Sequence, residues 1–193
     1  GERRTLARGE RARVRTSRDG LWCYLAIAGG VAAERRFGSA SHGPRKAWGP
    51  RLERGVRLGA GSAAASAPAE AIPERTGSGS PLRIWRGPQW DRFDARAREQ
   101  FLSSEWTVTR AIDRIGYRLA GPALESPAMS LASEPVRTGT VQVPPDGQPI
   151  AIMPDGPTIG GYAKIAWIEP DDLARLAETR PSHTVRFRLT EDG

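Results

Sequence analysis

Residues 133–166 read SEPVRTGTVQVPPDGQPIAIMPDGPTIGGYAKIA, and this stretch decides the fold that we expect. Two short runs rich in apolar residues, 139–143 and 150–153, are each bounded by proline or glycine. Because proline fixes φ and removes a backbone donor, these runs are predicted to be short strands. Short strands at such close spacing are typical of a β-sandwich or a β-barrel.

The same pattern continues on both sides of this stretch. An amphipathic helix is predicted over residues 90–102, because four apolar side chains fall near one helical face: Trp90, Phe93, Ala97 and Phe101. A second helix is predicted over residues 169–177, which carry a proline and two acids in the first turn. Further strands are predicted at 81–86, 106–109, 116–119, 165–168 and 184–189.

The N-terminal part has its own pattern. Residues 12–31 are predicted to form a β-hairpin whose second strand is buried. The only cysteine, Cys23, lies in the apolar run 21–28, and we interpret it as a core residue. A lone cysteine can form no internal disulfide and supports no thiolate metal site. Residues 60–80 are rich in Ala, Ser and Gly and are predicted to be a linker.

The charge and composition exclude several classes of function. The formal charge of +7 comes from 27 arginines and two lysines, and the arginines are spread along the chain. A nucleic-acid binder concentrates its basic residues on one face. No apolar run approaches the roughly 20 residues of a membrane span, and the N-terminus shows no secretory signal. We expect a cytoplasmic protein that binds neither nucleic acid nor membrane.

The first candidate site segment places Arg114 and Arg118 on either side of Gly116 and Tyr117. Guanidinium groups suit the recognition of a carboxylate, and glycine permits a close approach of the backbone. The alternative is a turn centred on Asp113 whose arginines are solvated. The segment therefore predicts substrate contacts from Arg114, Tyr117 and Arg118.

The second candidate segment is the stiff loop 142–149. Its paired prolines fix φ, and Asp146-Gly147 supplies a turn between two strands. The loop is either a plain hairpin connection or the rim of a ligand site, in which case Gln142, Pro145 and Asp146 contact the substrate.

The third candidate segment is residues 158–164. Paired glycines at 160 and 161 expose backbone N–H groups that could hold an oxyanion, unless they only form a tight turn. Lys164 is one of two lysines, which indicates a need for an ammonium group here. The predicted site residues are Thr158, Gly160, Gly161, Tyr162 and Lys164, the last two as catalytic residues.

Other kinds of site find little support. The two histidines, His42 and His183, have no carboxylate at a metal-ligand spacing, so we predict no metal site. The glycine pairs lack the strand, lysine and helix of a phosphate-binding loop. Any ATP site is therefore expected on a partner.

Five segments in this order resemble one known family: WDRF, FLSSEWTVTRAIDRIGYRLAGP, SEPVRTGTVQVPPDGQPI, GGYAKIA and PSHTVRF. The family is that of the biotin-dependent carboxyltransferases, which includes the C subunit of 5-oxoprolinase, allophanate hydrolase subunit 2 and urea amidolyase-related proteins. Upstream, WCYLAIAGGV and FGSAS extend the resemblance. This chain reads PDGPTIGGYAKIA where relatives usually read something like ADRQTTGGYPKIA.

The resemblance implies a mainly β protein. A cyclophilin-like β-barrel with a few short helices is expected at residues 81–193, as a carboxyltransferase-type subdomain. Residues 1–60 are expected to be the C-terminal part of a second, β-rich subdomain, and 61–80 a flexible linker. Relative to the family, the chain is expected to be truncated at its N-terminus.

The resemblance also implies a function. We expect a subunit of an ATP-dependent 5-oxoprolinase, which converts 5-oxoproline to glutamate, or of a related biotin-dependent carboxyltransferase or amidolyase. The implied partners are a kinase-inhibitor-type companion (the 5-oxoprolinase B subunit) and a lactam-utilisation companion (its A subunit), with a small cyclic amide or urea-type substrate. ATP would act through the partners, and biotin would arrive on another protein. The alternatives are a regulatory module that binds the kinase-inhibitor-type companion, or an inactive fragment.

If the chain works in an enzyme, each candidate segment has a role. Arg114 and Arg118 would clamp a carboxylate, the amides of Gly160 and Gly161 would stabilise an oxyanion, and Tyr162 and Lys164 would orient or polarise the substrate.

Overall fold

The computed structural model describes residues 5–14, 20–42, 52–61, 79–127 and 131–190. The chain divides into two compact units, which are described separately. Unit 1 comprises residues 1–13 and 23–74, and unit 2 comprises residues 14–22 and 75–193.

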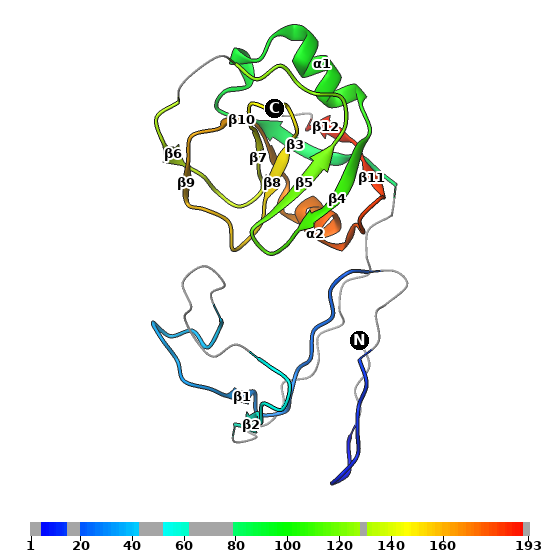
Figure 1. Cartoon of the computed structure of the whole chain (residues 1–193), viewed down its shortest axis with the longest axis vertical. Helices are drawn as coiled ribbons and strands as arrows, with labels where there is room; N and C mark the ends of the chain where they lie inside the picture. Colours follow the sequence, from blue (N-terminus) through cyan, green and yellow to red (C-terminus); the bar gives the residue numbers. More distant parts are fainter. Residues whose placement is uncertain (1–4, 15–19, 43–51, 62–78, 128–130, 191–193) are drawn as a thin grey trace. The chain divides into compact units, whose positions relative to one another are not determined.

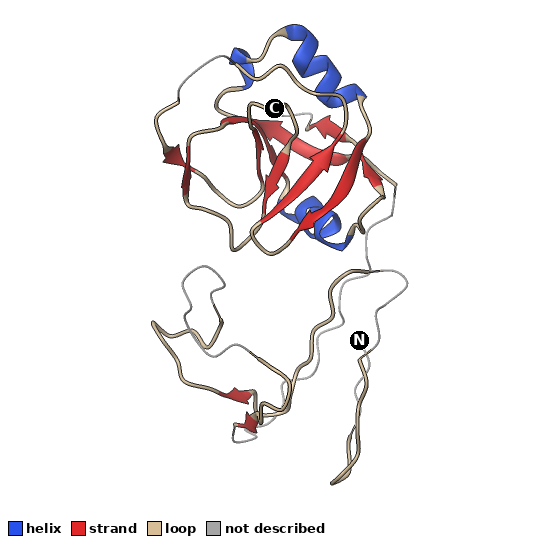
Figure 2. Cartoon of the chain, in the orientation of Figure 1, coloured by secondary structure: helices blue, strands red, loops and turns tan. Residues whose placement is uncertain are grey.

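Unit 2 is built on one curled sheet (Figures 1 and 2). Within the described residues this sheet has eight strands in the order β11-β4-β5-β8-β7-β10-β3-β12. Their bounds are β3 Leu82–Arg86, β4 Trp106–Ile112, β5 Gly116–Ala120, β7 Thr140–Val143, β8 Ile150–Ile152, β10 Ala163–Ile168, β11 Thr184–Val185 and β12 Phe187–Leu189. The predicted strands are thus confirmed, although residues 184–189 form two strands rather than one.

The division of residues 184–189 into β11 and β12 nearly closes the barrel. β11 pairs with β4 at one end of the strand order and β12 pairs with β3 at the other, yet Arg186 alone separates β11 from β12 in sequence. The two edges of the sheet must therefore lie close together. A closed barrel buries the edge groups that an open sheet exposes, so the mainly β, barrel-type fold is confirmed.

The barrel interior is filled by alternate side chains of the strands. In β3 the inward residues Leu82 and Ile84 are buried, while Arg83 and Trp85 between them are partly exposed. The other strands contribute large, fully buried side chains, among them Trp106, Val108, Tyr117, Leu119, Val141 and Ile165. This alternation is the period of two that a strand imposes on its side chains.

The predicted helix over residues 90–102 is divided in two. A short 3₁₀ helix, η1, spans Trp90–Arg92, and α1 spans Ala95–Ser103. Between them Asp94 caps α1, its side chain accepting a 2.6 Å hydrogen bond from Ala97 N. Asp is a favoured N-cap because its oxygen satisfies a backbone donor of the first turn. The four predicted apolar residues are all buried, so the predicted apolar face is confirmed.

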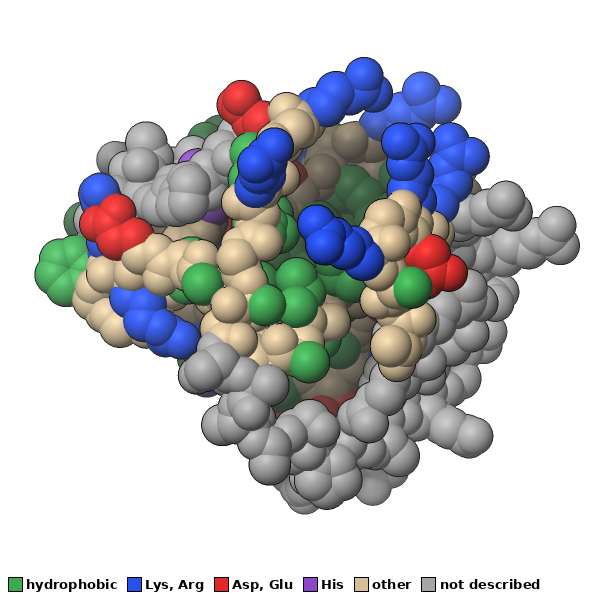
Figure 3. All heavy atoms as spheres, turned by 90° about the horizontal axis from the view of Figure 1, so that it is seen from below, with side chains coloured by type: hydrophobic (Ala, Val, Ile, Leu, Met, Phe, Trp, Pro, Cys, Tyr) green, Lys and Arg blue, Asp and Glu red, His purple; other side chains and the backbone are tan. Residues whose placement is uncertain are grey.

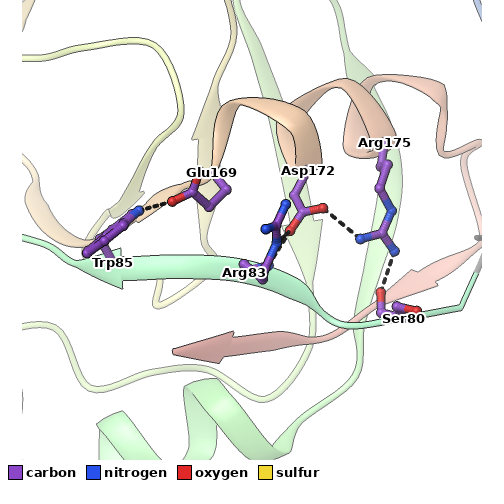
Figure 4. Close-up of polar contacts among 6 residues, drawn as sticks. All are labelled: Ser80, Arg83, Trp85, Glu169, Asp172 and Arg175. Carbon is purple, nitrogen blue, oxygen red and sulfur yellow. Dashed lines mark hydrogen bonds and ion pairs between the residues drawn. The ribbon is translucent and has the colours of Figure 1, made fainter. Parts of the chain in front are cut away.

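The second helix, α2, spans Pro170–Glu178 and is fastened to β3 by a buried carboxylate (Figure 4). Asp172 accepts hydrogen bonds from Arg83 N at 2.7 Å, Arg83 Nε at 2.8 Å and an Arg175 guanidinium nitrogen at 2.8 Å. Burial raises the pKa of Asp172, but the bonds from Arg83 and Arg175 outweigh it and hold the pKa below its ordinary value. Neither α1 nor α2, the described α-helices, is long and apolar enough to cross a membrane.

A small sheet accompanies the barrel. Its strands are β6 Glu134–Pro135 and β9 Ile159–Gly160, which pair antiparallel with Glu134 opposite Gly160. Both strands belong to the connections before β7 and β10.

In unit 1 the described strands are β1 Val31–Ala32 and β2 Gly59–Ala60, paired antiparallel. Residues 21–28, which are described, do not form the predicted buried strand, and Cys23 is exposed, so the interpretation of Cys23 as a core residue was wrong. The reason is that the described residues of unit 1 contribute no member to the hydrophobic core. Apolar side chains such as Tyr24 and Phe37 are therefore left on the surface. On the face seen in Figure 3, hydrophobic side chains (green) lie among basic side chains (blue).

Two N-terminal predictions lie mostly outside the described residues. The hairpin turn was expected at residues 18–20, of which 18 and 19 lie outside the described residues, and most of the linker falls on residues 62–78.

Candidate functional site

Two residues of the predicted site lie opposite each other on neighbouring strands, Lys164 on β10 and Gln142 on β7. Residues directly opposite in an antiparallel pair share one face of the sheet. The next opposed pair, Val143 and Ala163, belongs to the hydrophobic core. Lys164 and Gln142 therefore point to the outer face of the barrel, where both are nevertheless buried.

The ammonium group of Lys164 is held by a carboxylate from β6. Lys164 Nζ lies 2.6 Å from Glu134 Oε1, and Gln89 Nε2 donates a 2.7 Å hydrogen bond to the same oxygen. Gln89 is also tied to β10, because its Oε1 accepts from Lys164 N at 3.0 Å and its backbone N–H donates to Lys164 O. The Lys164 ammonium lowers the pKa of Glu134 below its ordinary value against the opposing effect of burial, and Gln89 lowers it further.

Gln142 completes this cluster beneath β9. Its side chain is 4% exposed, and its Nε2 has no hydrogen-bond partner among the described residues. A Cβ added at Gly160 would lie 3.0 Å from that Nε2 and 3.3 Å from Val136 Cγ2. Position 160 therefore favours glycine, because there is little space for a side chain. Gly160 lies in strand β9 and not in the tight turn that was the alternative.

Sequence reasoning missed two members of this cluster, Gln89 and Glu134. Glu134 lies in the stretch that carries the family resemblance, but no spacing rule connects it with Lys164, thirty positions later in the chain. We call Gln89, Glu134, Gln142 and Lys164 the polar cluster.

A pocket of about 360 Å³ lies beside the polar cluster, where the chain continues from Gly160. Three predicted site residues line it: Pro145, Gly161 and Tyr162. The other lining residues are Leu124, Glu125, Ser126, Pro127, Leu131, Val143 and Ala163. The volume lies within the roughly 300–1,000 Å³ that is typical of small-molecule sites. We call it the rim pocket.

The groups around the rim pocket differ in exposure. Tyr162 is 49% exposed, whereas Val143 and Ala163 are buried. The Ser126 hydroxyl donates to Val143 O at 3.2 Å. The described residues that line the pocket include one acid, Glu125, and no lysine or arginine. No sequence signal had drawn attention to residues 124–127.

The two predicted arginines are engaged in ion pairs away from the rim pocket lining. Arg114 Nε lies 2.7 Å from Asp155 Oδ2, and an Arg118 guanidinium nitrogen lies 2.7 Å from Asp146 Oδ2. Asp113 Oδ1 accepts from Ile115 N and Gly116 N, as in the alternative of a turn centred on Asp113. Arg118 and Asp146, both predicted to contact the substrate, are thus paired with each other.

The remaining predicted residues, Tyr117 and Thr158, have structural contacts. Tyr117 is fully buried, and its hydroxyl donates to Ala177 O at 2.8 Å and accepts from Trp22 Nε1 at 3.1 Å. The carbonyl of Thr158 accepts from Val136 N at 2.8 Å.

The groups around Gly160 and Lys164 do not fit a triphosphate. Gly160 lies in a strand, and the Lys164 ammonium is buried against Glu134, whereas a phosphate-binding loop presents free N–H groups and a free lysine. Within the described ranges, no three His, Cys, Asp or Glu side chains are placed to hold a metal ion.

Comparison with known proteins places this geometry in a family. Residues 1–189 match the family described as carboxyltransferase domain, subdomain A and B. The chain is 34% identical to the C subunit of 5-oxoprolinase from Escherichia coli (strain K12) over 99% of its own length. It is also 25% identical to the urea amidolyase of Saccharomyces cerevisiae over 94% of its length, which is 11% of that protein.

A solved structure has a similar fold. The crystal structure of TTHA0988 matches with a TM-score of 0.73 and 36% identity, covering 84% of this chain and 32% of that one. The chain spans 64% of the length of the Escherichia coli relative. The family match covers almost all of the sequence, and the chain belongs to the carboxyltransferase domain family, subdomain A and B.

Proposed function

We propose that this chain is a component of an ATP-dependent complex that hydrolyses 5-oxoproline to glutamate. The observation that carries the proposal is the 34% identity to the C subunit of 5-oxoprolinase along 99% of the chain. The rim pocket supports it, because its size and its mixed polar and apolar lining suit a small cyclic amide. A urea-type substrate is the related choice.

The rim pocket provides the substrate contacts in this proposal. The Tyr162 hydroxyl is a hydrogen-bond donor for a substrate oxygen, and the adjacent Gly161 lines the pocket beside it. The described lining has no cation, so a substrate carboxylate needs a positive group from elsewhere. A companion protein of the complex is the natural source of that group.

Lys164 has a positioning role in this proposal. Its ammonium holds Glu134 of β6, and β6 pairs with β9, which leads directly into Gly161 and Tyr162. Fixing β6 therefore fixes one wall of the rim pocket. Direct catalysis by Lys164 stays a prediction; the contacts favour positioning, because the side chain is only 2% exposed and already paired.

ATP and biotin belong to other chains in this proposal. We assign ATP to the kinase-inhibitor-type and lactam-utilisation companions, since the groups around Lys164 do not fit a triphosphate. Any biotin would be carried by another protein, and no step here depends on it.

One observation favours a second candidate, a regulatory module that binds a companion protein without catalysis. The ammonium group of Lys164, a residue predicted to be catalytic, is paired and buried, and the described lining of the rim pocket has no cation. Such a module needs an intact partner surface but no catalytic residue.

Turnover separates the two candidates. The chain is co-expressed with the kinase-inhibitor-type and lactam-utilisation companions, and the ATP-dependent loss of 5-oxoproline is measured. The Tyr162→Ala variant is expected to lower kcat/KM by about tenfold or more, because a positioned hydrogen-bond donor is lost. The matched control is Arg110→Ala on β4, an exposed residue outside the pocket lining. A complex that assembles fully and turns over nothing would favour the regulatory module.

A further inference from the structure

A second pocket lies on the outer face of β3 and β10, beside the start of α2. Its volume is about 620 Å³. The residues that line it belong to unit 2: Trp85, Arg86, Arg137, Thr138, Trp167, Ile168 and Pro170. They are distinct from the residues of the rim pocket and of the polar cluster. We call it the tryptophan pocket.

Two indole rings form its floor. Trp85 on β3 and Trp167 on β10 are directly opposite each other in the antiparallel pair, so their side chains stand next to each other on one face. The Trp85 indole N–H donates to Glu169 Oε1, and Figure 4 shows the two side chains pointing toward one another. The bonds of Asp172 fasten α2, and therefore Glu169, to the same strand. These contacts hold Trp85 against the start of α2.

One arginine side chain stands over this floor. The Arg137 guanidinium carbon lies 3.8 Å from the centroid of the Trp167 ring, a stacked cation–π arrangement. Stacking fixes the plane of the guanidinium and leaves its N–H edges directed outward. Arg86 also lines the pocket, although its guanidinium carbon lies 6.0 Å from the centroid of the Trp90 ring, which is outside the lining. Both arginines are exposed.

The arginines in the described part of unit 2 fall into two groups. Six arginines in the described part of unit 2 lie within ion-pair distance of Asp or Glu: Arg83, Arg98, Arg114, Arg118, Arg175 and Arg186. Among the same described residues no such carboxylate is found for Arg86 or Arg137, as is also the case for Arg96, Arg110 and Arg188. Arg86 and Arg137 are the two of this group that line the pocket. One oxygen of Glu169, the acid beside the pocket floor, is occupied by the Trp85 N–H. The pocket is therefore apolar below and positively charged above.

This composition fits a protein segment better than a small molecule. Small-molecule sites orient their ligands with a few buried polar groups, whereas Arg86, Arg137 and Thr138 of this pocket are all exposed. Tryptophan and arginine are enriched among the residues that dominate protein–protein binding. Positive charge at the rim calls for a partner of opposite charge.

We propose that the tryptophan pocket docks an acidic segment of the kinase-inhibitor-type companion. A carboxylate of that segment pairs with the N–H edge of Arg137, and an apolar side chain beside it packs on Trp85. The inference rests on the proposed function, because that function supplies the companion. The site of docking is separate from the site of turnover, so the two are tested apart.

The experiment titrates the purified kinase-inhibitor-type companion into the full chain by calorimetry. Arg137→Glu is expected to weaken binding by about tenfold or more, because it sets a like charge against the acidic segment and removes the stacked anchor. Arg110→Glu, the same charge reversal on an exposed residue of β4, is the matched control and is expected to change the affinity less than about twofold. Arg137 is exposed, and thermal melting confirms that both variants stay folded.

Each result has a defined meaning. A selective loss in Arg137→Glu, together with nearly unchanged binding in Arg110→Glu, supports docking at this pocket. Equal affinity of wild type and Arg137→Glu overturns the docking proposal, while 5-oxoproline turnover by the complete complex leaves the proposed function standing. No binding by the wild-type chain overturns the docking proposal too. Perturbation of the Trp167 indole N–H resonance by millimolar 5-oxoproline without any companion identifies a small-molecule pocket and also overturns it.

Discussion

Glu134→Gln removes the carboxylate that holds the Lys164 ammonium and keeps a side chain of almost the same shape. Lys164 Nζ lies 2.6 Å from Glu134 Oε1, and the lysine side chain is only 2% exposed. Removing one partner of a buried ion pair leaves the other charge uncompensated, which typically costs about 3–5 kcal/mol. The Glu134 side chain is 37% exposed, so solvent screening lowers the figure. The glutamine oxygen also still accepts a hydrogen bond, and we expect a loss of about 2 kcal/mol.

The assay is denaturant and thermal unfolding of the full chain at neutral pH. A loss of about 2 kcal/mol corresponds to a fall in Tm of roughly 8 °C for a domain of this size. Glu105→Gln is the matched control, because Glu105 pairs with Arg186 at the surface with both side chains more than half exposed. An exposed pair of that kind contributes about 0.5 kcal/mol or less.

The pH dependence has a definite sign. The Lys164 ammonium holds the pKa of Glu134 below its ordinary value of 4.5. A depressed carboxylate pKa stabilises the fold above the ordinary value, and this contribution is lost as the pH falls through the folded-state pKa. The stability difference between wild type and Glu134→Gln should therefore be constant above about pH 5 and shrink at lower pH, since a protonated Glu134 resembles Gln.

Lys164→Met supplies the test of the pairing itself. Once the buried charge is gone, Glu134→Gln should cost almost nothing, so the double variant should be more stable than the sum of the single losses predicts. Additive losses, or a Glu134→Gln variant as stable as Glu105→Gln, would refute the reasoning that this pair holds β6 in place.

Three further changes have expected outcomes. Asp172→Asn should lower the free energy of unfolding by about 3 kcal/mol, read from chemical denaturation, because a buried carboxylate that joins β3 to α2 loses its charge. Gly160→Ala should cost about 1–2 kcal/mol in the same measurement, since the new Cβ would meet Gln142 Nε2 at 3.0 Å; a neutral result would show that the polar cluster is loosely packed. Tyr117→Phe should cost about 1 kcal/mol, because its hydroxyl bonds Ala177 O, yet leave 5-oxoproline turnover per folded complex unchanged.

The local part of the fold could be predicted from the sequence. Proline and glycine mark the ends of short strands, and these signals act within a few residues, so most of the strands and α2 lie where they were expected. The division of residues 90–102 also had a local signal that was not used, because Asp94 is a favoured N-cap.

The contacts between distant segments could not be predicted in this way. Closure of the barrel depends on β11 and β12 joining opposite ends of the strand order. The pairing of Glu134 with Lys164 depends on β6 lying over β10. Neither contact leaves a periodic trace in the sequence, because the pairing of strands is set by packing across the whole sheet.

Only part of the candidate site could be predicted, because the site too depends on contacts between distant segments. Gly161 and Tyr162 were chosen from a glycine motif, and they do line the rim pocket. Arg114 and Arg118 were chosen by residue type, and surface carboxylates hold both of them. In the N-terminal part, the apolar run around Cys23 suggested burial, but burial requires other apolar surfaces to cover it, and the described residues of unit 1 do not supply them.

The most direct test of the central claim is the ATP-dependent loss of 5-oxoproline in a purified complex. The kinase-inhibitor-type and lactam-utilisation companions are assayed with and without this chain under matched conditions, with glutamate measured as the product. We predict that the loss of 5-oxoproline and the formation of glutamate require the chain and fall in the Tyr162→Ala variant. Equal turnover with and without the chain would contradict the proposed function.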